Sequence, residues 1–592
     1  MGLDYWLVHF TWTIPPAALL TVAYWPFFTR TEILKIFTLI TIAVIATIPW
    51  DSYLIRNRIW TYPDDAVVGV TIFKIPIEEV FFFIIQTYLT GLLYMILHKR
   101  LVLPVYLLPK FINSSMNFVP LVLSGGIAAA AACIWVGNEL TYMGLIMGWA
   151  LPVIAFQWFF GGSFLLALPK KPILISILLP TVYLWMVDFL SLQRGTWVIE
   201  PGTKLDLQFG GYLDVEEALF FLMTNVMVVL GFVTMDHAIA IAEYEDAIAA
   251  PGHNKSQSFQ QVVWNYMTRR QRSLDLGFLE GLSIAIDRLA EKSQSMYLGS
   301  AMFQGRLRID LILLYSFCRV IDDLVDEAPD KETAKANIKE ASQVLYWHFS
   351  NKNLGKPLYE YLDAEYGAFQ KKRLSPLISS IALLPTSRLT IKPLLELLRG
   401  FEMDLGFCAE KNEFPITSES DLDLYAYRVA GTVASSLLEL IFGHFTTATS
   451  EEDRSRIIEA GQNMGQALQC VNIARDIKRD AAIARVYIPT FWLENEGLRP
   501  RDVIANPDDS KLAVLEERMI KKAEGLHDLN VAAIAQLPIE ARGPVKTTVE
   551  SYMMIGKMVR KRRQGALSKT NGKLRVPLWR RLSRAWWDMC SA

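Results

Sequence analysis

Residues 315–327 have the sequence Tyr-Ser-Phe-Cys-Arg-Val-Ile-Asp-Asp-Leu-Val-Asp-Glu, and this stretch decides the fold class of the C-terminal half of the chain. Apolar residues around it recur with the spacing of an α-helix, which places Asp322 and Asp326 one turn apart on the same face. Two like charges at this spacing repel each other by roughly 0.2–0.5 kcal/mol on an isolated helix. A cation bound between them would remove that repulsion, so the stretch predicts a helix that binds a metal ion.

Residues 469–480, Gln-Cys-Val-Asn-Ile-Ala-Arg-Asp-Ile-Lys-Arg-Asp, repeat this arrangement. Asn472, Asp476 and Asp480 follow one another every four residues and again share one helix face. Two such helices facing each other would form an oxygen-lined site, and Mg²⁺ (or Mn²⁺) prefers oxygen ligands that it shares with substrate phosphates. The alternative is a solvated acidic face with salt-bridged arginines. The apolar flanks of both stretches favour the metal site.

The C-terminal half resembles the squalene/phytoene synthase family over roughly residues 275–575. Besides the two aspartate motifs, the resemblance rests on Gly-Phe-Glu-Met-Asp at 400–404, Tyr-Ala-Tyr-Arg-Val-Ala-Gly-Thr-Val at 425–433 and Arg-Val-Tyr-Ile-Pro at 485–489. It implies an all-helical fold, a substrate channel between the two aspartate helices, and the head-to-head joining of two prenyl diphosphates.

The resemblance also implies the roles of individual residues. Those expected to bind Mg²⁺ are Asp322, Asp326, Asn472, Asp476 and Asp480. Those expected to contact the diphosphate or to shape the pocket are Ser295, Tyr315, Arg319, Tyr425, Gln469, Arg475 and Tyr487. The assignment of Ser295 rests on a loose similarity of residues 293–297 to a serine-containing segment of the family.

The N-terminal half has the composition of a membrane protein. Apolar runs long enough to span a bilayer lie at about residues 3–25, 33–49, 72–97, 117–137, 141–165, 173–190 and 212–235. Beyond them the sequence becomes charged and amphipathic, so we expect a membrane domain over 1–235, a linker over 236–260 and a soluble domain over 261–592. Loops on the C-terminal side of the spans carry more lysine and arginine, which predicts that the soluble domain faces the cytosol.

The membrane half contains an internal repeat. Asp51 and Trp60 recur as Asp188 and Trp197, each 137 residues later, and a pair of adjacent glutamates recurs 138 residues after its first occurrence. This offset predicts a tandem duplication of a three-span unit, with an extra span between the copies. Repeats of this kind often place a site at their interface.

Ionisable residues inside a bilayer are costly, so the duplicated acidic residues are functional candidates. For Glu79 and Glu217 the alternative is a place at the aqueous end of a span, where they would cap the helix. Asp51 and Asp188 could instead be residues of the interface between the copies. The candidates for catalysis are Glu78, Glu216, Asp51, Asp188, Trp60 and Trp197.

The membrane half resembles the membrane-embedded lycopene cyclases, over roughly residues 1–235. The matching segments are Pro-Ile-Glu-Glu at 76–79 and Val-Glu-Glu at 215–217, although Asp-Val replaces Pro-Ile in the second copy. The resemblance implies cyclisation of lycopene ends to β-rings, giving γ- and β-carotene without net oxidation. A carboxyl group desolvated by lipid can keep its proton and act as the acid. The faces of the tryptophans can stabilise the resulting cation.

The two resemblances fit one pathway, since a synthase that makes forty-carbon phytoene from two geranylgeranyl diphosphates suits a cyclase for forty-carbon carotenes. Phytoene must be desaturated before cyclisation, so a separate phytoene desaturase is expected. The sequence has no Gly-x-Gly-x-x-Gly fingerprint near its N-terminus, and neither a flavin nor a nicotinamide cofactor is predicted. The formal net charge of −1 argues against a nucleic-acid partner.

Two alternatives for the membrane half stay open: an anchor for a phytoene or squalene-type synthase, or a transporter built on repeats. A retinal protein is not indicated, because residues 212–235 contain no lysine for a Schiff base. At the other end of the chain, the C-terminal segment is typical either of contact with an anionic membrane lipid surface or of a solvated basic tail. Its basic and aromatic residues include Arg580, Arg581, Arg584, Trp579, Trp586 and Trp587.

Overall fold

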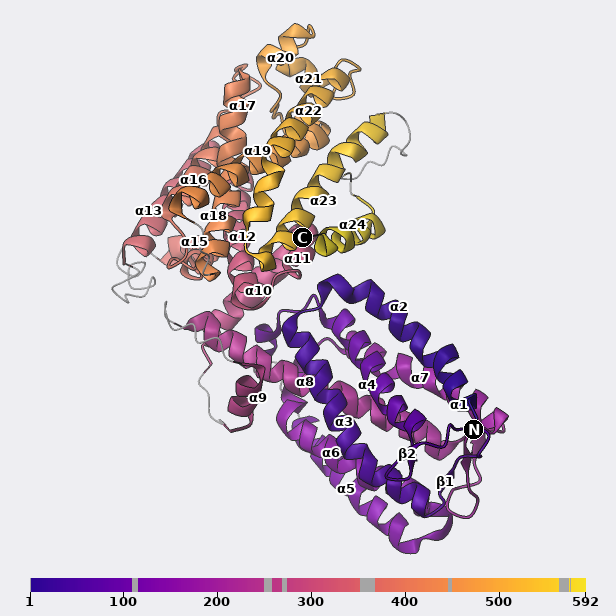
Figure 1. Cartoon of the computed structure of the whole chain (residues 1–592). Coiled ribbons are helices and arrows are strands. Elements are labelled where there is room, and N and C mark those ends of the chain that lie inside the picture. Colours follow the sequence, from indigo (N-terminus) through magenta and orange to yellow (C-terminus); the bar gives the residue numbers. More distant parts are fainter. Residues whose placement is uncertain are drawn as a thin grey trace. The chain divides into compact units, whose positions relative to one another are not determined.

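The computed structural model describes residues 2–108, 115–249, 258–268, 274–351, 368–445, 450–563, 574 and 576–591. The chain forms two compact units, Met1–Leu279 (unit 1) and Glu280–Ala592 (unit 2), whose helices are labelled in Figure 1. Helices dominate the described part, where every strand is only two residues long. The predicted all-α fold class is confirmed.

Unit 1 contains seven helical segments that are long and apolar enough to cross a membrane, which confirms the predicted number of spans. Large apolar side chains such as Phe37, Leu121 and Phe159 are exposed on them, as expected where a helix faces lipid rather than a protein core. The segments are Asp4–Phe27, Arg30–Arg56, Ile77–His98, Phe118–Val136, Asn138–Ala167, Lys170–Arg194 and Val215–Ile248.

The first of these segments combines several short helices, whereas each later one is built on a single long helix. The elements of the first segment are α1 (Asp4–Val8), η1 (His9–Thr13), α2 (Ile14–Tyr24) and η2 (Trp25–Phe27). The long helices are α3 (Arg30–Arg56), α4 (Ile77–His98), α5 (Ser115–Val136), α6 (Thr141–Ala167), α7 (Lys170–Arg194) and α8 (Val215–Ile248). The shorter helices of unit 1 are η3 (Leu103–Leu107), η5 (Asn138–Leu140) and α9 (Phe259–Thr268).

Strands occur at matching places in the two copies of the repeat, between the second and third spans of each. They are β1 (Trp60–Thr61), β2 (Thr71–Ile72) and β3 (Ile75–Pro76), then β4 (Val198–Ile199), β5 (Gln208–Phe209) and β6 (Leu213–Asp214). Strands β2 and β3 form one hairpin and β5 and β6 form the other. The first copy therefore ends with α4, the second begins with α6, and α5 is the extra span between them.

The two copies meet through equivalent positions. Strand β1 pairs antiparallel with β4, its counterpart in the second copy, and Trp60 lies opposite Ile199. The side-chain amide of Gln86 donates to the hydroxyl of Thr224, 138 positions further on, at 2.7 Å. Contacts between equivalent positions indicate that an approximate twofold relation connects the copies.

A buried ion pair joins three of the spans. Lys35 Nζ lies 2.6 Å from Asp236 Oδ1, and the hydroxyl of Tyr94 donates to Asp236 Oδ2 at 2.8 Å. Charges inside a membrane domain are tolerated when they are paired and hydrogen-bonded in this way. The contact therefore fixes α3, α4 and α8 relative to one another.

Unit 2 is built around α19, a helix of 32 residues that contributes to two apolar clusters of the described residues, and mostly to one of them. The other cluster is formed mainly by helices earlier in the unit. The larger helices of the unit are α10 (Leu276–Lys292, which begins in unit 1), α12 (Gly305–Asp326), α13 (Lys331–Asn351), α15 (Ala368–Ala382), α16 (Ile391–Asp404), α18 (Thr432–His444), α19 (Glu451–Ala482), α22 (Leu512–Asn530), α23 (Ile539–Arg563) and α24 (Leu578–Cys590). The shorter ones are α11 (Gln294–Ser300), α17 (Glu419–Ala426), η6 (Tyr427–Gly431), α20 (Thr490–Asn495), α21 (Pro500–Ala505) and η7 (Val531–Gln536).

The division into units differs from the boundary and linker expected from the sequence. Helix α8 does not end at residue 235 but continues to Ile248, because Ala240 and Tyr244 still bury their side chains in unit 1. Phe259, which lies in the expected linker, packs in the same apolar cluster as Ala240. Polar residues on the remaining faces of this extension give it the composition of a soluble segment.

The close approach of α19 to η6 gives a test of the packing in unit 2. A Cβ at Gly465 would lie 2.6 Å from the carbonyl oxygen of Ala430, so we expect Gly465→Ala to destabilise unit 2 by about 1–3 kcal/mol. Gly525 is an exposed helical glycine with open space around its Cβ position, and Gly525→Ala is expected to stabilise by about 0.5–1 kcal/mol. Thermal unfolding of the purified full-length chain compares the two. Equal thermal unfolding midpoints for the Gly465→Ala and Gly525→Ala variants would show that α19 and η6 do not approach this closely.

Candidate active sites

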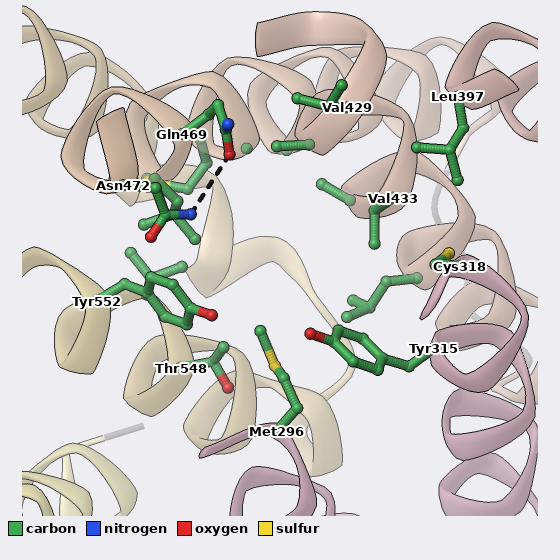
Figure 2. A pocket seen from close by; sticks show the side chains of 18 of the residues that line it. Met296, Tyr315, Cys318, Leu397, Val429, Val433, Gln469, Asn472, Thr548 and Tyr552 are labelled. Atoms are coloured by element: carbon green, nitrogen blue, oxygen red, sulfur yellow. Dashed lines mark hydrogen bonds between the residues drawn. The ribbon is translucent and has the colours of Figure 1, made fainter. Parts of the chain in front are cut away.

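Unit 2 contains a partly open cavity of about 550 Å³ between α12, α16, α19 and α23. Both aspartate motifs border this cavity, whereas much of the remaining wall is apolar. Figure 2 shows Tyr315 and Tyr552 on facing walls, each with its hydroxyl group directed into the space between them. The apolar lining residues include Phe303, Leu397, Phe401, Val433, Leu437 and Leu438.

The first aspartate motif lies on α12, which turns its apolar face, including Phe317 and Ile321, into the core of unit 2. This packing leaves the acidic face toward the cavity. Arg319 bridges the motif, with its NH1 2.7 Å from Asp322 Oδ2 and its NH2 2.7 Å from Asp323 Oδ1. Arg485 NH2 reaches Asp326 Oδ1 at 2.9 Å from a different segment of the chain.

The second motif lies on α19 and also contains a close arginine–carboxylate pair. Arg475 donates from Nε to Asp476 Oδ1 at 2.8 Å and from NH2 to Oδ2 at 2.5 Å. The amide of Asn472 donates to Gln469 Oε1 at 3.3 Å (Figure 2), which leaves the buried Oδ1 of Asn472 without a partner among the described residues. Asp480 completes the acidic wall.

Burial perturbs three of the carboxyl groups that line the cavity. Desolvation, reinforced by repulsion from Asp326, raises the pKa of Asp322 to about 6 despite the attraction of Arg319. Desolvation and repulsion from Asp476 raise the pKa of Asp480 to about 7. Burial raises the pKa of Asp404 to about 7 as well, although its arginine and tyrosine neighbours act in the opposite direction. The negative charges of this wall therefore lack full compensation.

A divalent cation fits the acidic wall of the cavity, because such an ion prefers oxygen ligands. The wall offers carboxylate oxygens whose charge is only partly compensated, and Asn472 adds a buried Oδ1 atom without a partner among the described residues. Within the described ranges, no three His, Cys, Asp or Glu side chains come together as a complete metal site. Mg²⁺ often uses only one or two protein carboxylates and shares its remaining positions with water and substrate phosphates. The structure thus brings the five predicted metal-binding residues to the wall of one cavity.

The predicted substrate-binding residues of unit 2 line the same cavity, with two exceptions: Arg475 is not part of the lining, and the side chain of Ser295 lies outside the described residues. The hydroxyl of Tyr315 donates to Ser293 Oγ at 3.0 Å. The remaining members of the group are Arg319, Tyr425, Gln469, Arg475 and Tyr487; the last is in contact with Asp404. Arg475 does not line the cavity itself, but its hydrogen-bond partner Asp476 does.

Sequence reasoning missed Asp404 and Tyr552. The hydroxyl of Tyr487 donates to Asp404 Oδ1 at 2.9 Å, and the ring of Tyr487 stacks on that of Tyr425 with centroids 4.9 Å apart. Asp404 closes the segment 400–404, so its place in that motif was an available signal. Tyr552 lies far along the chain in α23 and has no motif around it.

The membrane unit gathers acidic side chains from both copies of the repeat. Glu79 Oε2 accepts hydrogen bonds from the hydroxyls of Tyr5 at 2.5 Å and Tyr62 at 2.9 Å. Asp51 is completely buried, and neither of its carboxyl oxygens has a hydrogen-bond partner in the described part of the chain. Glu79 lies within electrostatic range of Asp51, so the two form one acidic group.

The second copy contributes a matching group. Tyr142, which lies 137 positions after Tyr5, donates its hydroxyl to Glu217 Oε1. Trp197 donates its indole N–H to Asp188 Oδ1 at 2.9 Å. Glu217 and Asp188 are only 2% and 1% exposed, so neither is at an aqueous helix end.

The two members of each glutamate pair have different environments. Glu78 Oε1 accepts from the backbone N–H of Val68 at 2.8 Å, and Glu216 Oε1 accepts from that of Leu205 at 2.7 Å. These contacts tie the loop of each copy to the start of its third span. Glu79, at 4% exposure, is directed instead toward the acidic group that contains Asp51. The sequence analysis left two alternatives open for Glu79 and Glu217, and it did not identify their tyrosine partners.

Both candidate tryptophans contact the opposite copy. The ring of Trp60 packs edge-on against Tyr142 and Phe220, with centroids 6.2 and 5.7 Å apart. The ring of Trp197 lies 4.9 Å from that of Tyr5. The acidic groups are thus enclosed by aromatic rings, which suits a site where a carbocation forms away from water.

Comparisons with known proteins agree with the division into two units. Residues 4–97 match the family model described as lycopene cyclase, and residues 289–580 match the one described as squalene/phytoene synthase. A bifunctional lycopene cyclase/phytoene synthase from Arthroderma gypseum is 50% identical over 602 residues and is covered, like this chain, to 100%. One from Aspergillus oryzae is 46% identical, with 98% of each chain covered. Among solved structures, a dehydrosqualene synthase in complex with a ligand matches 53% of this chain and 96% of its own, with 20% identity and a TM-score of 0.41.

The raised pKa values of Asp322 and Asp480 predict how a metal ion affects stability. In the folded chain without metal these groups protonate near pH 6–7, above their usual range near 4. The stability that they contribute is therefore fully present below pH 4 and is lost as the pH rises through 6–7. Metal binding requires the ionised form, so Mg²⁺ should raise the Tm of unit 2 more at about pH 8 than at about pH 6.

Scanning calorimetry of the full-length chain, with and without MgCl₂, measures this difference. Asp480→Asn is expected to reduce the effect of Mg²⁺ at the higher pH. A Tm increase of equal size at both pH values would contradict the assignment of these carboxyl groups.

Proposed function

The chain belongs to the family of bifunctional lycopene cyclase/phytoene synthases, and on that premise we propose which of its residues carry each reaction. Unit 2 contains the phytoene synthase domain, and unit 1 contains the lycopene cyclase domain. The predicted pairing of two carotenoid-forming activities in one membrane-associated chain is confirmed.

For the synthase reaction, the carrying observation is one cavity with acidic side chains from two helices on its wall and apolar side chains over much of the rest. Two geranylgeranyl diphosphates would place their diphosphates at the acidic wall and their prenyl chains along the apolar one. The first substrate ionises, and the double bond of the second attacks the cation. A proton leaves to give a cyclopropyl intermediate. A second ionisation, rearrangement and proton loss give phytoene, so that two diphosphates and two protons are released in total.

The residues proposed to hold Mg²⁺ are Asp322, Asp326, Asn472, Asp476 and Asp480. When bound there, Mg²⁺ neutralises the leaving diphosphate and promotes its departure. Arg319 and Arg475 now pair with carboxylates and can donate to phosphate oxygens when substrate arrives. The apolar wall excludes water, which would otherwise capture the cation. Tyr315 and Tyr552 direct hydroxyl dipoles into the space where the cation forms.

Substitution in the acidic wall should separate the two activities of the chain. We expect Asp476→Asn to lower phytoene formation at least about 10- to 100-fold, because it weakens metal binding and releases Arg475 from its partner. Lycopene cyclisation by the same molecules should be unchanged and serves as the control for folding. The assay supplies geranylgeranyl diphosphate and Mg²⁺ without NADPH and identifies the hydrocarbon. Phytoene formation at full rate in the variant, or a squalene-type reduced product in the native chain, would refute the assignment.

For the cyclase reaction, the carrying observation is the set of buried carboxyl groups from both copies inside an aromatic enclosure. We propose that Glu79 and Glu217, with Asp51 and Asp188, donate a proton to the terminal double bond of lycopene and later remove one from the new ring. One proton enters the substrate and one leaves it, so the reaction needs no oxidant or reductant. Trp60 and Trp197 would stabilise the cation through their ring faces.

Glu78 and Glu216 are proposed as positioning residues, because each holds a loop through a backbone N–H. The pair Glu78→Gln and Glu79→Gln tests this distinction. A glutamine at 78 can still accept from Val68 N–H, so the first variant should retain most of its cyclase activity. The second removes a group that gains or loses a proton and should lower cyclisation by about 10²–10⁴-fold.

The assay measures γ- and β-carotene formed from lycopene by the purified variants, with phytoene synthesis as the control for folding. A larger loss for Glu78→Gln than for Glu79→Gln would assign the proton transfer to the first glutamate of the pair.

Contact of unit 2 with lipid is also proposed, from the surface of α24. Leu578, Trp579, Leu582 and Trp587 are 53%, 66%, 56% and 63% exposed, although large apolar side chains usually pack inward. Arginines lie between them, a composition that suits the headgroup region of an anionic membrane. Quenching of the fluorescence of Trp579 and Trp587 by brominated lipids, measured against a variant that lacks both, tests this contact.

We also propose that unit 2 faces the cytosol and that a separate phytoene desaturase works with this chain. The distribution of basic residues in the loops supports a cytosolic unit 2, which protease treatment of sealed membranes would test. The chemistry requires that a separate phytoene desaturase acts between the two reactions, because phytoene lacks the conjugated double bonds of lycopene. Purified chain that forms cyclised carotene from geranylgeranyl diphosphate alone would contradict this requirement.

A further inference from the structure

The two copies of the repeat do not enclose two separate acidic groups. Glu79 of the first copy lies within electrostatic range of Asp188 and Glu217 of the second, as well as of Asp51 in its own copy. All four side chains are at most 4% exposed. They therefore form one buried cluster at the junction of the copies.

The aromatic enclosure of this cluster is exchanged between the copies. Trp60 packs on Tyr142, which donates to Glu217, whereas Trp197 packs on Tyr5, which donates to Glu79. Each copy thus supplies a tryptophan to the half of the enclosure that surrounds the other copy's glutamate. Pairing of β1 with β4 holds these two tryptophans in register. Neither copy alone supplies all the aromatic residues that surround its own glutamate.

The two halves are also chemically unequal. Asp188 accepts the indole N–H of Trp197, but neither carboxyl oxygen of Asp51 has a hydrogen-bond partner in the described part of the chain. Glu79 accepts a second hydroxyl, from Tyr62. The position equivalent to Tyr62 in the second copy is Ile199, which has no polar side chain. Two sites that performed the same reaction independently would be expected to share one set of partners.

We propose that the two copies form a single cyclisation site, in which carboxyl groups of both copies act on the same lycopene end. The inference rests on the cyclase function proposed above and specifies its site. One carboxyl group of the cluster gives its proton to the terminal double bond, the ring closes, and a carboxylate of the cluster takes a proton from the ring. The total number of protons on the cluster is then unchanged. Lycopene is cyclised one end at a time, and γ-carotene must leave or turn around before its second end reacts.

Paired substitutions in equivalent positions distinguish one site from two. The variants are Asp51→Asn, Asp188→Asn and the double variant, measured in the full-length chain with lycopene. If the site is single, each single variant loses at least about 100-fold in rate, and the double variant is little worse than either because the groups act as a unit. The matched controls are Asp64→Asn and Asp206→Asn, which change exposed aspartates in the loops of the two copies and should cyclise at the native rate.

The rates of the single and double variants also distinguish failure of the single-site inference from failure of the proposed function. If each single variant keeps about half of the rate and only the double variant is inactive, the copies are two independent sites and the inference is overturned, while the proposed function stands. If even the double variant retains full rate, the proposed assignment of these carboxyl groups fails. Phytoene synthesis by the same samples reports folding. Should an asparagine variant fail to fold, Glu79→Gln and Glu217→Gln, singly and together, must give the single-site pattern for the inference to hold.

Discussion

A carboxyl group removed from water is stable as an anion only beside a partner that compensates its charge, and both proposed sites of this chain are built on that constraint. In the synthase unit, arginines compensate part of the charge, as Arg475 does for Asp476. In the membrane unit, neutral donors take this place, as the hydroxyls of Tyr5 and Tyr62 do for Glu79. The kind of partner determines which chemistry the carboxyl groups can support.

Arginine pairs suit a site that must exchange one anion for another. A diphosphate can replace a carboxylate as the acceptor of an arginine fork, and the released carboxylates are then available to a divalent cation. Hydroxyl and indole partners suit a site that must gain and lose protons, because they leave the carboxyl group without a fixed positive neighbour. Carboxyl side chains can therefore serve diphosphate binding in one unit and proton transfer to a hydrocarbon in the other.

The sequence predicted most of this arrangement because its main signals are periodic. The four-residue spacing of Asp322 and Asp326 places them on one helix face without any tertiary information, and the offset of 137 between Asp51 and Asp188 is visible by inspection. The choice within each glutamate pair could not be predicted, because adjacent residues differ in direction by about 100° on a helix. Which of them meets a loop and which meets Tyr5 depends on tertiary packing. The end of α8 was missed since burial, rather than composition, extends it to Ile248.

The central claim is that the acidic wall of the synthase cavity accepts a diphosphate only when a divalent cation is present. Calorimetric titration of inorganic diphosphate into the purified full-length chain tests it directly. We expect measurable binding with Mg²⁺ and none with the metal chelated, because the carboxyl groups of Asp322 and Asp480 are only partly compensated by arginines and repel an anion when ionised. Equal affinity for diphosphate with and without Mg²⁺ would contradict it.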